Sequence, residues 1–486
     1  MSDALTRPAA AGTSAPPRPN AVVAVLALAG IVVSLMQTLV IPIVPELPTL
    51  LHASASDTAW AVTATLLAAA VATPVVGRLG DMIGKRRMLL TSIVLLVAGS
   101  VVCALADSIG RTLQGLAAAV VPLGISIMRD ALPAERLAGS TALMSASLGV
   151  GGALGLPAAA FIADKWDWHI LFWTSAALGA VAFALVLLIV PESKVRTGGR
   201  FDIAGALGLS AGLVTLLLAV SKGATWGWTS GTTLGLGTAA VVILLAWGFW
   251  ELRSGQPLVD LRTTAKPQVL FTNLASIALG FSMFAMSLVL PQLLQLPEQT
   301  GYGLGKSMLT VGLVLAPQGL VMMAMSAASA KLTQAKGPKV TLMIGALIVG
   351  AGYALNIVLM SEVWHLILVS CIIGAGVGFT YGALPALIMG AVDPSETAAA
   401  NSLNTLMRSL GTSFASAIAG VILSQMTTDF GGHALASENG FKVVMAIGAG
   451  AALLAFLVAT FIPRQKTAAA AATDADREVE TVGAEA

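Results

Sequence analysis

The chain has 486 residues, of which 57% are hydrophobic and only 10% are charged, and its mean hydropathy is +0.88. These values exclude an ordinary soluble domain and indicate an integral membrane protein. The formal net charge of +2 gives no reason to expect a nucleic-acid partner, because the basic residues are dispersed over many short polar segments.

The first 20 residues contain four prolines and no apolar core, so we expect a disordered cytoplasmic tail rather than a signal peptide. We expect a second cytoplasmic tail of this kind over residues 464–486. Between the tails, apolar stretches of about 20 residues follow one another, and this length crosses a ~30 Å hydrocarbon layer as a helix. Fourteen spans are predicted, at 21–43, 57–79, 88–106, 108–128, 138–162, 170–190, 203–220, 232–250, 268–290, 304–327, 340–360, 363–390, 397–424 and 441–462.

An even number of spans places both termini on the same side of the membrane. With the N-terminus inside, twenty of the 26 basic residues fall in inner segments and four in outer segments, while Arg111 and Arg408 fall inside spans. Cytoplasmic loops of membrane proteins carry this excess of Lys and Arg. The distribution therefore supports both the number of spans and cytoplasmic termini.

Two weak sequence echoes indicate an internal repeat. Residues 77–85 are echoed by 330–338, and 133–135 are echoed by 394–396, so each pair relates span n to span n+8. The prediction is an all-α polytopic membrane protein of 14 transmembrane helices. It has a six-helix bundle over 21–190, a linker with two inserted helices over 191–267, and a second six-helix bundle over 268–463. The first half is eight residues shorter between these landmarks, which leaves a short fourth span.

The stretch GRLGDMIGKRRM, residues 77–88, concentrates five charges after the second span. Gly84 permits a tight reversal between two helices, and the basic run keeps the loop in the cytoplasm. Asp81 is the one carboxylate beside four cations. It can form ion pairs or lie against the N-terminus of a neighbouring helix.

Gly77, Asp81, Gly84, Lys85 and Arg86 resemble the signature that major facilitator superfamily transporters carry between spans two and three. The resemblance implies that Asp81 joins the two halves at the cytoplasmic face and controls its opening. The alternative is a solvated loop charge, which contributes about 0–1 kcal/mol.

Arg111, Gln114 and Gly115 at the start of the fourth span resemble a second signature of the same family. The resemblance implies a role in proton coupling, and an arginine inside a span usually faces an interior. Because Arg111 lies only three residues into the short span, snorkelling of its side chain to the outer interface is the competing interpretation.

Gly149, Gly152, Gly155 and Pro157 in the fifth span resemble the antiporter signature of the family, although Leu156 separates the last glycine from the proline. The resemblance implies an exporter. Small residues also allow helices to approach closely, so helix packing explains the same residues.

Further stretches are similar to the fourteen-span drug:proton antiporter branch of this family; they are 166–172, 200–205, 257–262 and 401–411. One departure is Met36, which stands where that branch usually has an aspartate. No Asp or Glu lies deep in any predicted span, so the usual carboxylate for proton exchange is not visible. Candidate substrate contacts are Gln37, Trp60, Asn404 and Arg408.

The resemblance implies a secondary transporter of the cell membrane that exports hydrophobic or amphipathic, drug-like or antibiotic-like small molecules, in exchange for protons and as a monomer. A proton-independent facilitator or symporter remains an alternative, as does a transport-dead membrane receptor. No residue grouping indicates an enzyme, a metal site or a cofactor.

Overall fold

A computed structural model describes residues 19–39, 55–105, 127, 129–130, 134–193, 195–431 and 433–463. Within these residues, thirteen helices have 20 residues or more. They are α1 (Pro19–Leu39), α3 (Ala55–Ile83), α4 (Lys85–Ala104), α6 (Ala134–Lys165), α7 (His169–Ile189), α8 (Ile203–Trp226), α9 (Gly231–Arg253), α11 (Pro267–Gln295), α12 (Met308–Lys336), α13 (Pro338–Val358), α14 (Val363–Met389), α15 (Thr397–Gln425) and α16 (Glu438–Thr460). Twelve segments of the described part are long and apolar enough to cross a membrane.

Each of these thirteen helices overlaps one predicted span, and the predicted fourth span lies almost wholly outside the described residues. The total of fourteen spans therefore stays a prediction. The predicted boundaries of the tenth span, 304–327, were wrong. α12 begins at Met308, because Gly305 has a φ of +60° and the Ser307 hydroxyl caps the N–H of Thr310. It then continues to Lys336, since its polar last turns form a helix beyond the apolar stretch.

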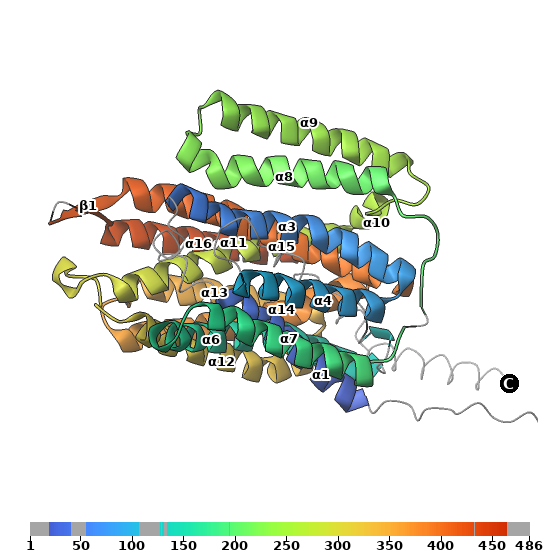
Figure 1. Cartoon of the computed structure of the whole chain (residues 1–486), viewed down its shortest axis with the longest axis horizontal. Coiled ribbons are helices and arrows are strands. Elements are labelled where there is room, and N and C mark those ends of the chain that lie inside the picture. Colours follow the sequence, from blue (N-terminus) through green and yellow to red (C-terminus); the bar gives the residue numbers. More distant parts are fainter. Residues whose placement is uncertain are drawn as a thin grey trace, which may run out of the picture.

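The described connections contain short elements that hydropathy does not predict. They are α10 (Leu261–Thr264), the 3₁₀ turns η4 (Glu298–Thr300) and η5 (Pro394–Glu396), and the strands β1 (Thr427–Phe430) and β2 (His433–Ala436). The strands form an antiparallel hairpin in which Thr427 faces Ala436. It lies at the end of the molecule opposite to α10 (Figure 1).

The long helices run side by side along the longest axis of the molecule (Figure 1). α6 packs against α1 and α12, while α3 packs against α15. Under the predicted repeat, the α3–α15 and α6–α12 pairs are equivalent. The division into two bundles stays a prediction.

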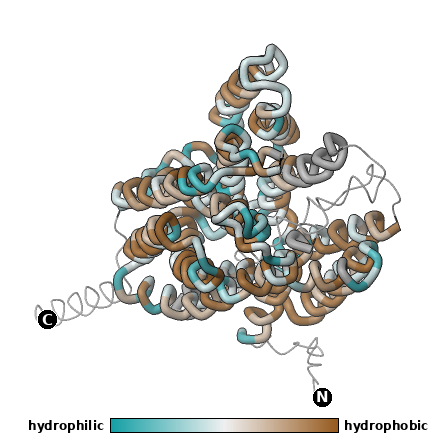
Figure 2. Tube along the Cα trace, turned by 90° about the vertical axis from the view of Figure 1, so that its left-hand side faces the viewer, coloured by the Kyte–Doolittle hydropathy of each residue, from teal (hydrophilic) through white to brown (hydrophobic). Residues whose placement is uncertain are grey.

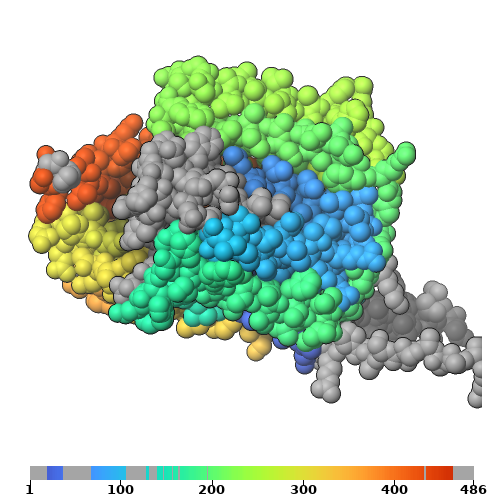
Figure 3. Space-filling view, in the orientation of Figure 1, coloured from blue at the N-terminus to red at the C-terminus, as the bar shows by residue number. Residues whose placement is uncertain are grey.

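α8 and α9 form a separate layer, in which α8 packs on α3 and α15 (Figures 1 and 3). The outer surface of the helices is apolar, as expected where lipid replaces water, and Figure 2 shows hydrophobic residues around the periphery. Leu188 and Val358, for example, are 80% and 77% exposed.

Candidate functional site

The N-terminus of α15 is capped by a side chain from α3. Asp81 is fully buried and accepts hydrogen bonds from the N–H groups of Ala398 (N···O 3.1 Å) and Ala399 (2.8 Å). These N–H groups lie in the first turn of α15 and have no partner within that helix. Glu396, at the N-cap position, makes no capping hydrogen bond with its own side chain. Asp81 therefore replaces the N-cap side chain, and its carboxylate lies at the positive end of the helix dipole.

Lys85 is buried beside Asp81 and connects several segments. Its Nζ lies 2.7 Å from the carboxylate of Asp130, 3.6 Å from that of Asp81 and 3.5 Å from the carbonyl oxygen of Pro394. The Ser193 hydroxyl donates a second hydrogen bond to Asp130 (2.5 Å). A buried ammonium is costly unless it is paired, so these oxygens hold Lys85 at the junction of α3, α4 and the turn before α15.

Two arginines add contacts across the same junction. Arg78 lies 3.9 Å from the carboxylate of Glu396, and Arg129 donates hydrogen bonds to the Thr397 hydroxyl (2.6 Å) and the Val392 carbonyl oxygen (3.2 Å). Burial lowers the pKa of the Arg129 guanidinium, and neighbouring carboxylates oppose that shift. All of these contacts bring the end of α3, or the segment before α6, onto the start of α15.

α3 and α15 approach each other closely at Gly77. A Cβ at Gly77 would lie 2.2 Å from Ser402 Oγ, 2.6 Å from Ser402 Cβ and 2.9 Å from the carbonyl oxygen of Ala398. Only glycine fits there without displacing a helix. We call this region the α3–α15 latch; it comprises Gly77, Arg78, Asp81 and Lys85 with residues 394–402.

The remaining residues of the predicted gating loop, Gly84 and Arg86, contact the end of α7 and the segment after it. Gly84 has a φ of +134°, and a Cβ there would lie 2.8 Å from a carboxylate oxygen of Glu192. The N–H of Arg86 donates to the same carboxylate (3.2 Å), and the Arg86 guanidinium donates to the carbonyl oxygen of Leu187 at the end of α7. The predicted loop therefore divides into residues that contact α15 and residues that hold α4 against the segment after α7.

Sequence reasoning missed three polar partners of this region. These partners are Asp130, Glu192 and Ser193. Polar residues are common at the ends of spans, so residue type alone does not identify a partner. The positions of Glu192 and Ser193 directly after Pro191, where the chain leaves α7, were the available signal.

The predicted antiporter motif lies on α6; its residues are Gly149, Gly152, Gly155 and Pro157. Two of them face glycines of α12. A Cβ at Gly319 would lie 2.3 Å from the carbonyl oxygen of Gly149, and one at Gly312 would lie 2.7 Å from the backbone nitrogen of Pro157. Gly151, which the motif does not include, meets the backbone of α1 in the same way. The motif therefore lies in a close helix–helix contact, which small residues allow.

Several candidate residues fall outside the part of the chain that the structure describes. Arg111, Gln114 and Gly115 lie in the undescribed stretch between α4 and α6. Gln37 and Trp60 belong to α1 and α3, but their side chains are not among those described. Their predicted roles stay predictions.

Asn404 and Arg408 lie one turn apart on α15. Asn404 is buried and donates from Nδ2 to the side-chain oxygens of Asn273 (2.9 Å) and Ser276 (2.8 Å) on α11. The guanidinium of Arg408 lies over the ring of Tyr381 on α14, 4.6 Å from its centroid. The two candidate residues are thus part of one polar region between α11, α14 and α15.

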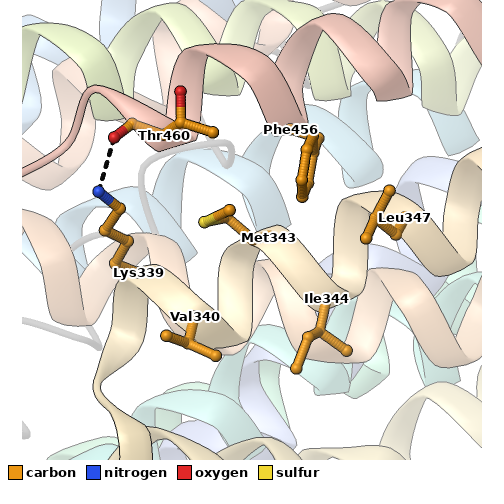
Figure 4. A pocket seen from close by; sticks show the side chains of 7 residues that line it. All are labelled: Lys339, Val340, Met343, Ile344, Leu347, Phe456 and Thr460. Atoms are coloured by element: carbon orange, nitrogen blue, oxygen red, sulfur yellow. Dashed lines mark hydrogen bonds between the residues drawn. The ribbon is translucent and has the colours of Figure 1, made fainter.

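A groove of about 310 Å³ separates α13 from α16 near their ends (Figure 4). Lys339 Nζ donates to the carbonyl oxygens of Thr460 and Ile462, each at 2.6 Å. Thr460 also lines the groove, and the remaining side chains there are apolar; they are Val340, Met343, Ile344, Leu347 and Phe456. The Lys339 ammonium therefore caps the end of α16 and has a structural role. The groove shares no lining residue with the polar region around Arg408.

Comparisons with known proteins agree on one protein family. The family model described as "Major Facilitator Superfamily" matches residues 26–416 and 337–483. "Multidrug resistance protein 3" of Bacillus subtilis (strain 168) is 24% identical over 76% of this chain and 73% of its own length. "Multidrug resistance protein B homolog" of Mycobacterium tuberculosis (strain ATCC 25618 / H37Rv) is 26% identical over 85% and 77%.

Solved structures show the same fold at low sequence identity. The human organic anion transporter MFSD10 (TETRAN) superposes with a TM-score of 0.65 at 15% identity, over 91% of this chain and all of that one. The proton:xylose symporter XylE superposes with a TM-score of 0.61 at 15% identity, over 92% and 96%.

Proposed function

The chain belongs to the major facilitator superfamily, and on this premise we propose that it exports hydrophobic or amphipathic, drug-like small molecules across the cell membrane. Relatives with multidrug names support an export role. The single observation that carries the proposal is the capping of α15 by Asp81 of α3, because it joins two parts of the chain more than 300 residues apart through contacts that can break and re-form.

The proposed mechanism is alternating access between two bundles, 21–190 and 268–463, with α8 and α9 inserted between them and both termini in the cytoplasm. In this scheme the α3–α15 latch closes the cytoplasmic side. Breaking the latch allows α3 and α15 to separate and admits a substrate from the cytoplasm. The predicted repeat makes the close α6–α12 contact the equivalent of the α3–α15 contact. It acts as the second interface along which the two bundles move.

Exchange with protons is the coupling that the family resemblance implies. A specific observation favours a second candidate, a proton-independent exporter. Every Asp and Glu on a helix with described bounds lies among the first or last three residues of that helix. The described helices therefore offer no carboxylate at mid-depth that could carry a proton during transport.

Dye efflux from cells that overexpress the protein tests both candidates. Export predicts faster efflux than in cells with an empty vector, and no difference between them would identify a receptor without transport activity. Nigericin in potassium buffer removes the pH gradient and leaves the electrical potential. Efflux that stops with nigericin identifies proton exchange, whereas efflux that continues identifies the proton-independent candidate.

A further inference from the structure

Arg408 carries a charge at mid-depth in a membrane-spanning helix. It lies eleven residues beyond Thr397, the first residue of α15, which places it about 16 Å along the helix at ~1.5 Å per residue. This is roughly half of a ~30 Å hydrocarbon layer. An arginine near a helix end can extend its guanidinium to the interface, but this distance is too long for that. A charge at this depth therefore needs a local reason.

Within the described part of the chain, the guanidinium of Arg408 contacts an aromatic ring and no hydrogen-bond acceptor. Arg408 and Tyr381 are both half-buried, and the aromatic ring supports the cation from one side. Among the residues that the structure describes, no carboxylate lies within ion-pair distance of Arg408. Its five N–H donors favour a planar, negatively charged group that can accept two of them.

The backbone beneath Arg408 is held in place by the crossing of α11 and α15. A Cβ at Gly280 would lie 2.0 Å from the carbonyl oxygen of Arg408, and one at Gly411 would lie 2.0 Å from that of Ile277. The Thr412 hydroxyl also lies 3.2 Å from the Gly280 carbonyl oxygen, to which it donates. The two backbones are therefore in close contact at this point, which restrains the backbone of Arg408 before any ligand binds.

The α11–α15 interface also contains the side-chain amide of Asn273, which pairs with Asn404. Asn273 is 4% exposed and its Nδ2 has no hydrogen-bond partner among the described residues. Its Oδ1 is already occupied by Asn404. An unpartnered buried N–H group is costly, and a bound water, ion or ligand can satisfy it. The polar region thus has a cation against an aromatic face at Arg408, and a spare N–H donor at Asn273 on the same α11–α15 interface.

We infer that Arg408 binds the anionic group of the transported molecule, and that the substrates are amphipathic organic anions with a carboxylate or sulfonate beside an aromatic ring. This inference rests on the proposed export function. Lipophilic cations are disfavoured at this position, because the described residues provide no mid-depth carboxylate to pair with them and Arg408 repels them.

Two dyes with the same xanthene ring test the inference. Proteoliposomes are loaded with anionic fluorescein or cationic rhodamine 6G, and release is measured above that of protein-free liposomes. Wild-type protein should release fluorescein at least tenfold faster than rhodamine 6G. Arg408→Gln should reduce fluorescein release at least tenfold without reducing that of rhodamine 6G, and Arg408→Lys should retain an intermediate rate.

Arg253→Gln is the matched control, because Arg253 also lies over an aromatic ring, that of Phe249 at 4.0 Å, but at the end of α9. Its fluorescein release should stay within twofold of wild type. Fluorescence anisotropy of fluorescein with detergent-solubilised protein, after a check of elution volume, measures binding separately from transport.

The outcomes separate the inference from the function on which it rests. Release of rhodamine 6G but not fluorescein by the wild-type protein would overturn the anionic substrate class and leave export intact. Equal fluorescein release and binding by wild type and Arg408→Gln would overturn the role of Arg408 alone. Release of neither dye by a folded protein would count against export itself, and the inference would fall with it.

Discussion

Replacing Gly77 by alanine should open the α3–α15 latch. The new Cβ would lie 2.2 Å from Ser402 Oγ and 2.9 Å from the carbonyl oxygen of Ala398, whereas carbon–oxygen contacts below about 3 Å are strongly repulsive. Rotation of the serine relieves the contact with Oγ, but the contacts with Ser402 Cβ (2.6 Å) and with the Ala398 carbonyl oxygen remain and require the helices to separate. Overpacking of this kind costs about 1–3 kcal/mol. If α3 and α15 are apart in the open state, the closed-to-open ratio falls by roughly 5–150-fold.

A distance measurement reports this shift directly. Spin labels at Ile83 and Lys266, both exposed near the latch, are attached after Cys103 and Cys371 have been replaced by alanine. Without a further substitution, pulsed electron paramagnetic resonance of this labelled protein should show mainly a short distance between the two labels. Gly77→Ala should add a longer-distance population, and transport should fall because the proposed mechanism passes through the closed state in every cycle.

Two further variants make the reasoning refutable. Ser402→Gly removes both serine contacts, so Gly77→Ala combined with Ser402→Gly should recover part of the short-distance population. Gly139→Ala is the control on α6, because its Cβ would meet only Ala330 Cβ at 3.7 Å, an ordinary contact. The steric explanation is wrong if Gly77→Ala keeps the wild-type distances, or if Gly139→Ala shifts them equally.

Three further predictions concern other contacts. Asp81→Asn should leave expression unchanged and lower transport about tenfold in vesicles. The single amide oxygen can replace only one of the two carboxylate oxygens that accept from the N–H groups of α15, and hydrogen bonds to charged groups contribute about 1.5–3 kcal/mol. Arg87→Gln is the control and should have no effect, because Arg87 is exposed. Gly319→Ala should destabilise the protein by about 1–3 kcal/mol, because its Cβ meets backbone, whereas Gly149→Ala meets a flexible methionine and should cost less, as thermal unfolding in detergent would show. Lys339→Met should lower the unfolding temperature by freeing two carbonyl oxygens at the end of α16 and leave transport unchanged.

The helices were predictable from the sequence because the length of an apolar stretch is a local property. Helix ends were less predictable: α12 starts at Met308 because of backbone conformation and capping, which hydropathy does not report. The loop containing Asp81 was recognisable by its pattern. Its partner, the N–H of Ala398, lies 317 positions away and is a backbone group that every residue has. No pattern in one sequence identifies such a pair, and the same holds for the contact of Lys85 with Asp130.

The substrate charge proposed above also bears on the source of energy. An inside-negative potential of 100 mV contributes about 2.3 kcal/mol to the outward movement of one negative charge, equivalent to roughly a 50-fold concentration ratio. A monoanion exporter therefore needs no proton-binding carboxylate at mid-depth, which agrees with the placement of Asp and Glu at the ends of the described helices. Release of fluorescein from proteoliposomes should accelerate when valinomycin and a potassium gradient make the interior negative, and slow when the gradient is reversed. A rate that follows the pH gradient and ignores the potential would instead require a proton-binding group, and would refute this account of the driving force.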